Sequence, residues 1–123
     1  MEGRVVQQVV ELISDFLPQG WKRMAFYAGY TSSSYEMKFF VDKGKGYIDC
    51  FKIYDINSFE IFDLFESIDN VLMRQRKELK KKDKWTVFTL LVDSKGKFNV
   101  FFDYQDIEEI SIEYFMQWQK KYL

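Results

Sequence analysis

The spacing of apolar residues changes early in the chain, and this change constrains the fold more than any other sequence feature. Over residues 3–17 apolar side chains recur at helical spacing, which predicts an amphipathic helix that Pro18 ends. Residues 21–30 and 35–41 instead alternate between apolar and polar, which predicts two strands. Because only the polar turn 31–34 separates them, these strands must pair antiparallel.

The rest of the chain adds further strands and two more helices. Asn57 is a candidate helix cap, and Glu60 three residues later completes a capping-box pattern. The further predicted elements are strands at 47–54, 85–92 and 97–103 and helices from about 57 to 81 and from 109 to 121. The order α-β-β-β-α-β-β-α predicts the α+β class, with an antiparallel sheet of about five strands and helices packed mainly on one face. We expect one domain spanning 1–123.

Some strands carry apolar side chains on both faces. Phe39 and Phe40 point opposite ways, and strand 97–103 also has phenylalanines on both sides. This predicts a sheet covered by helices on one side and by a partner on the other, although a central position in the sheet explains it equally well. Cys50 is interpreted as a small packing residue in the third strand.

Composition argues against several classes of function. The net charge is −1, whereas a general nucleic-acid binder that neutralises phosphates is clearly basic. There is no histidine and one cysteine, which removes His-based acid-base and nucleophile pairs and Cys-rich metal sites. We expect no catalytic residues, no cofactor and no metal. The sequence contains no targeting or membrane-spanning pattern, and a lone cysteine suits a cytoplasmic protein.

Charge is nevertheless segregated along the chain. Segment 55–69 holds five acidic residues and no basic one, whereas segment 74–84 holds seven basic residues against two acidic ones. Together they make the long predicted helix acidic at its start and basic at its end, which matches the helix dipole. The alternative for segment 74–84 is a nucleic-acid patch, but no aromatic residue interleaves it.

A third charge run lies near the C-terminus. Segment 99–119 has no Lys or Arg and includes Asp103, Asp106, Glu108 and Glu109. Acidic residues at a helix start are ordinary dipole partners. Together with Tyr104, they are also a candidate surface for a basic partner. A divalent metal site is a third possibility, although the spacing does not fit an EF-hand loop.

Several strings distributed over nearly the whole chain carry a family resemblance. They are WKRMAFYA at 21–28, SYEMKF at 34–39, KWTV at 84–87, VDSKGKF at 92–98, FDYQDI at 102–107, SIEY at 111–114 and KKYL at 120–123. With them in this order, the sequence resembles the YezG/EsaG-type immunity proteins of Gram-positive bacteria. The resemblance implies a non-enzymatic cytoplasmic antitoxin. Its partner would be the C-terminal domain, typically a nuclease, of an LXG-type toxin exported by type VII secretion.

The resemblance does not identify the contact residues. If the protein is such an antitoxin, the uninterrupted acidic charge near the C-terminus leads us to expect toxin binding by Asp103, Tyr104, Asp106, Glu108 and Glu109, covering the basic substrate groove of a nuclease. Deformation of the toxin, or pairing with one of its strands at a sheet edge, is a second mechanism. Two other functions stay open. One is an interaction or regulatory module that dimerises through the aromatic sheet face. The other is a metal-dependent hydrolase that uses carboxylates alone.

Overall fold

The computed structural model describes residues 3–53 and 56–123, which form three helices, two short 3-10 helices and five strands. The α+β class and the predicted element order are confirmed. In chain order the elements are α1 Gly3–Ser14, β1 Arg23–Tyr30, β2 Tyr35–Asp42, β3 Tyr47–Asp49, η1 Cys50–Lys52, α2 Ser58–Lys77, η2 Lys81–Asp83, β4 Val87–Asp93, β5 Phe98–Asp103 and α3 Ser111–Tyr122.

The five strands form one antiparallel sheet in the order β3-β2-β1-β4-β5. β1 lies at its centre, with Phe26 opposite Phe39 of β2 on one side and Leu90 of β4 on the other. A tight turn at each hairpin sets this pairing. In the β4–β5 turn, Asp93 accepts the N–H groups of Lys95 and Lys97, and Gly96 takes a positive φ of 87°.

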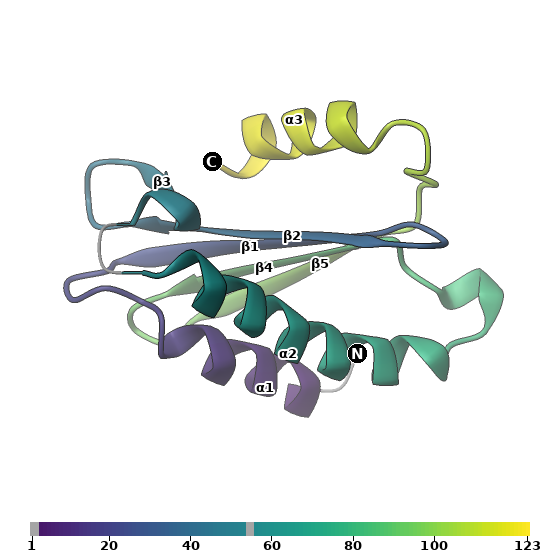
Figure 1. The fold of residues 1–123 in the computed structure, drawn as a ribbon, viewed down its shortest axis with the longest axis horizontal. Coiled ribbons are helices and arrows are strands. Elements are labelled where there is room, and N and C mark those ends of the chain that lie inside the picture. The colour runs from purple at the N-terminus through teal and green to yellow at the C-terminus, as the bar shows by residue number, and fades with distance from the viewer. Residues whose placement is uncertain (1–2, 54–55) are drawn as a thin grey trace.

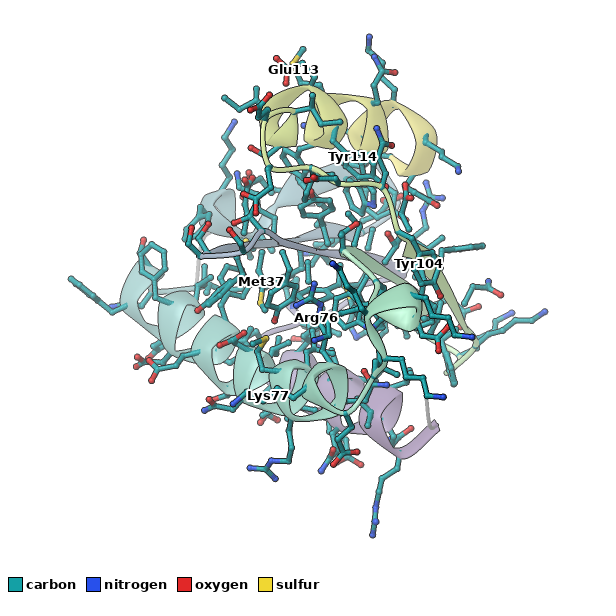
Figure 2. All side chains as sticks on the ribbon, turned by 90° about the vertical axis from the view of Figure 1, so that its right-hand side faces the viewer. Met37, Arg76, Lys77, Tyr104, Glu113 and Tyr114 are labelled. Atoms are coloured by element: carbon teal, nitrogen blue, oxygen red, sulfur yellow. The ribbon has the colours of Figure 1, made fainter. Side chains whose placement is uncertain are left out.

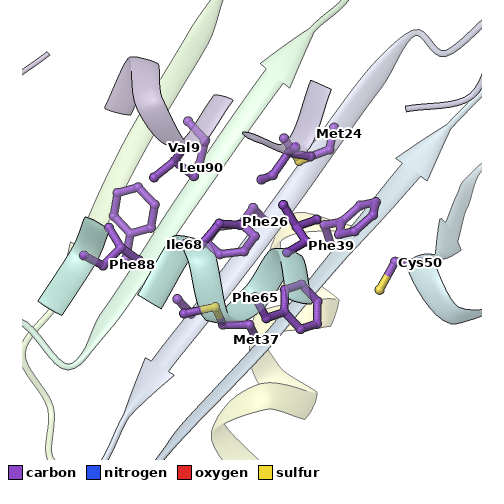
Figure 3. Close-up of a cluster of buried hydrophobic side chains, with 14 of the residues drawn as sticks. Val9, Met24, Phe26, Met37, Phe39, Cys50, Phe65, Ile68, Phe88 and Leu90 are labelled. Atoms are coloured by element: carbon purple, nitrogen blue, oxygen red, sulfur yellow. The ribbon is translucent and has the colours of Figure 1, made fainter. Parts of the chain in front are cut away.

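The sheet is covered on both faces by the chain itself. α1 and α2 cover one face and α3 covers the other (Figure 1). Met24, Phe26 and Ala28 of β1 face the α1 and α2 side, as the alternation predicts, and Figure 3 shows Phe26 among the side chains buried there. The intervening Tyr27 belongs to the cluster beneath α3. The second apolar face is therefore covered by α3, not by the partner that the aromatic pattern suggested.

One side chain in particular attaches α3 to the sheet. The indole of Trp118 is 3% exposed, and its Nε1 donates to the hydroxyl of Thr89, 2.8 Å away, on β4. Its ring also packs against Tyr27, with the ring centroids 5.0 Å apart, and Tyr27 stands in turn beside Phe115 of α3. The helix is held by aromatic burial together with a hydrogen bond inside the core.

The third strand departs from its prediction. It ends at Asp49, because the Asp49 carboxylate accepts the N–H of Phe51 and starts the 3-10 turn η1. Cys50 is fully buried as predicted, but in this turn instead of in a strand, and burial raises the pKa of its thiol to about 12. Residue 54, the last of the predicted strand, lies outside the described residues.

The predicted helix ends also shift by a few residues. α1 ends at Ser14, after which the N–H groups of Phe16 and Leu17 each bond three residues back. α2 ends at Lys77 for the same reason, since Glu78 and Leu79 also bond three residues back. At its start Asn57 caps the helix by accepting the N–H of Phe59, which confirms the predicted cap.

Candidate functional site

The segment that joins β5 to α3, residues 104–110, carries most of the predicted site and is called the link below. Asp103, the last residue of β5, anchors it. The Asp103 carboxylate accepts the Tyr114 hydroxyl at 2.6 Å and the N–H groups of Tyr104 and Gln105 at 2.7 and 3.0 Å. Partial burial opposes ionisation, but these three donors outweigh it and lower the pKa of Asp103. Asp103 therefore serves the fold.

The link is tied to the β1–β2 turn across a wide gap in sequence. Glu108 accepts the N–H of Ser32 at 2.6 Å, and Asp106 accepts the N–H of Glu108 at 2.9 Å. Between them lies Ile107, which is 2% exposed and packs into the hydrophobic cluster beneath α3. The two carboxylates thus shape the local backbone while remaining exposed themselves.

The link, the β1–β2 turn and the C-terminal half of α2 enclose a surface hollow of about 560 Å³. Tyr104, Asp106 and Glu108 line it on the link side, and Asp69 and Arg76 of α2 line it on the other. Tyr104 is 57% exposed, and Figure 2 shows it at the outer side of the molecule. We call this feature the link hollow.

The floor of the link hollow contains a cation, Arg76, that is held by several contacts. The Tyr30 hydroxyl donates to Asp69 at 2.7 Å. The guanidinium of Arg76 stacks over the rings of Tyr30 and Trp85, and its Nε donates to the Trp85 carbonyl oxygen at 2.7 Å. Burial lowers the pKa of Arg76. One basic residue of segment 74–84 is thus a packing residue, which further weakens the nucleic-acid interpretation.

The five predicted residues have three different surroundings. Asp103 is bound by three donors beneath the link. Tyr104, Asp106 and Glu108 meet around the link hollow, as the interpretation of a common surface requires. Glu109 is exposed but does not line the hollow. Within the described residues, the side chains of Tyr104 and Glu109 take part in no hydrogen bond.

The structure also shows a second acidic and aromatic surface, which the sequence interpretation missed. Phe59 and Phe62 of α2 are 78% and 58% exposed and lie among the exposed carboxylates of Glu60, Asp63 and Glu66. We call these five residues the α2 surface. The sequence could have indicated this surface, because both phenylalanines fall outside the apolar stripe that the helix buries. That stripe consists of Ile61, Leu64, Phe65, Ile68 and Leu72. Asp55, which the acidic run also included, lies outside the described residues.

Over 3–53 and 56–123, no group of three or more His, Cys, Asp or Glu side chains is placed to hold a metal ion.

No helix in the described part of the chain has the length and apolar character needed to cross a membrane.

The comparisons with known proteins agree with one another. A family model described as "Immunity protein YezG-like" matches residues 3–123. Immunity protein YezG of Bacillus spizizenii is 27% identical over 116 residues, an alignment that covers 85% of this chain and 70% of that protein. Because the family model matches almost every residue, the chain belongs to the YezG-like immunity protein family.

Proposed function

We propose that this protein is a cytoplasmic antitoxin that binds the C-terminal nuclease domain of a cognate LXG-type toxin and blocks it without catalysis. The observation that carries the proposal is the family match over residues 3–123, since immunity proteins have a toxin as partner. The relative from Bacillus spizizenii is also described as an immunity protein. The acidic charge of the link supports the more specific inference that the toxin domain is a nuclease.

The proposed mechanism is occlusion of the nuclease groove by the exposed side chains of the link, three of which line the link hollow. A groove that binds nucleic acid neutralises phosphates with Lys and Arg, so an acidic surface is complementary to it. Asp106, Glu108 and Glu109 supply that charge, and the exposed ring of Tyr104 supplies an anchor that can be desolvated on binding. Asp103 contributes by holding the link in place.

The test separates binding from folding. Tyr104→Ala combined with Glu109→Lys removes the anchor and reverses a charge, and neither side chain holds the fold together. We expect this variant to bind the toxin domain at least about tenfold more weakly and to protect plasmid DNA correspondingly less. Asp106→Asn with Glu108→Gln extends the test, because amide oxygens can still accept the N–H bonds while the charge is lost.

A matched control uses the α2 surface. Phe62→Ala with Glu60→Lys also removes one exposed ring and reverses one charge, and it should leave inhibition unchanged. If the control loses inhibition and the Tyr104 variant retains it, the interface lies on α2 and the occlusion site is wrong. If the wild-type chain binds no nuclease domain encoded beside it, the proposed function fails. Hydrogen exchange on the toxin distinguishes occlusion, which protects the active site, from deformation, which loosens distant segments.

A further inference from the structure

β5 forms an unusually bare edge of the sheet. It is the terminal strand of the sheet, and within the described part of the chain it pairs with β4 alone. Natural edge strands are guarded by charges, prolines or bulges, yet residues 98–102 read FNVFF. The opposite edge differs, because the part of β2 that extends beyond β3 carries Glu36 and Lys38. Phe98 and Phe101 of β5 are 44% and 43% exposed.

The hydrogen-bonding direction along this edge follows from its register. Asp93 donates its N–H to the Lys97 carbonyl oxygen at 2.9 Å, so Lys97 directs its backbone groups toward the β4 side. Backbone direction alternates along a strand. Phe98, Val100 and Phe102 therefore direct their N–H and C=O groups away from β4, toward the open edge.

The edge is complementary to itself in charge. Lys95 and Lys97 lie at its start, whereas Asp103 and Asp106 lie at its end. Two copies of such a strand, when antiparallel, place the basic end of each beside the acidic end of the other.

We propose that β5 pairs antiparallel with β5 of a second copy of this chain, about a twofold axis at Val100, joining the two sheets into one. In this register the outward backbone groups of Val100 face those of its copy, and those of Phe98 face those of Phe102. The Phe98 and Phe102 side chains then lie on one face as an aromatic pair, twice over. On the other face, Lys97 lies opposite Asp103. A second copy fits because both the rings and the charges match under this symmetry.

This dimer is a property of the free chain and does not depend on the proposed antitoxin function. A single strand pairing is a small interface, so we expect a dissociation constant in the micromolar range. Sedimentation equilibrium of the full chain should show the mass rising from 14.9 kDa toward twice that value between about 1 μM and about 1 mM. A mass that stays at 14.9 kDa throughout would overturn the proposal.

A charge reversal tests which edge is used. Lys97→Glu places a carboxylate opposite Asp103 and should weaken the dimer at least about tenfold. Lys45→Glu makes the same change in the β2–β3 loop at the other edge of the sheet and should leave the dimer unchanged. Equal effects of the two variants, or no effect of Lys97→Glu, would show that a different surface associates.

Cysteine cross-linking tests the register. Asn99 of one copy lies opposite Phe101 of the other, in a non-hydrogen-bonded pair with Cα atoms about 4.5 Å apart, within the range of a disulfide. An oxidised equimolar mixture of Asn99→Cys and Phe101→Cys chains should therefore cross-link, while neither variant alone should. Native Cys50 is fully buried and does not interfere. Cross-linking of either variant alone would contradict the register. In a separate measurement, if the amides of β5 are protected from hydrogen exchange only when toxin is present, the edge binds the toxin and the proposed dimer is wrong.

Discussion

The Asp103 side chain stabilises both the end of β5 and the link that follows it. Its carboxylate takes the hydroxyl of Tyr114 from α3 and two N–H groups from the link, which together join β5, the link and α3. The acidic run around it suggested a binding role for all its members. The structure separates Asp103, whose hydrogen-bonding capacity is used inside the molecule, from Tyr104 and Glu109, whose side chains face solvent.

Replacing Asp103 should therefore destabilise the fold more than replacing its acidic neighbours. Asp103→Ala leaves the partly buried Tyr114 hydroxyl without its acceptor and should lower the free energy of unfolding by about 2 kcal/mol. Tyr114→Phe removes one bond and should cost about 1 kcal/mol. Glu109→Ala, the exposed control, should stay within about 0.5 kcal/mol. Urea denaturation measures all three, and equal values for Asp103→Ala and Glu109→Ala would refute the anchoring role.

Among the helices, α3 occupies the position that sequence periodicity could least determine. Its apolar residues at helical spacing predicted burial, and Trp118 is indeed buried, but the face of the sheet that it covers is set by contacts with β1 and β4. β3 is the opposite case. Its apolar run continued past Asp49, but the Asp49 side chain accepted a nearby backbone N–H and ended the strand after three residues.

Removing the buried indole of Trp118 should show how strongly the fold depends on the packing of α3 against the sheet. Trp118→Ala should lower the free energy of unfolding by about 3 kcal/mol or more, because it leaves a cavity and an unpartnered Thr89 hydroxyl. Trp118→Phe keeps most of the ring contacts and should cost less. Met116→Ala, on the same helix but 53% exposed, is the control and should cost about 0.5 kcal/mol or less. Comparable losses for Trp118→Ala and Met116→Ala would mean that α3 is not held by this core.

At the scale of the whole molecule, three carboxylates among residues 3–53 and 56–123 couple folding to pH. The N–H of Gly44 and the guanidinium of Arg23 lower the pKa of Asp42. For Asp49, burial opposes ionisation, but Lys38 and the N–H of Phe51 outweigh it and lower the pKa. Asp103 behaves likewise through Tyr114 and the link. A folded-state pKa below the unfolded value gives stability that is complete above the unfolded pKa and is lost as pH falls through the folded one.

We therefore expect the stability of the protein to be level around neutral pH and to decline in acid. The ordinary pKa of these carboxyls is 3.8, so the decline should begin near that pH and continue below it. The chain has no histidine, which removes the usual titration between about pH 6 and 7. Urea midpoints measured from neutral to acidic pH test this. Asp103→Asn should lose less stability in acid than the wild type, and a parallel decline in both would contradict it.

The local sequence by itself determined the element order, the antiparallel pairing within the hairpins and the alternation of side chains along β1 and β2. Periodicity, caps and turn residues act over a few neighbours, so they can be read without a structure. It also determined that the C-terminal run is acidic and carries Tyr104. Only the tertiary structure decided three other features. Glu108 accepts the N–H of Ser32, Arg76 packs against the rings of Tyr30 and Trp85, and β5 is left as an open edge of the sheet. The first two features depend on contacts between residues that are distant in the sequence, and the third depends on the order of the strands in the sheet. The local spacing of residue types encodes neither the contacts nor the strand order.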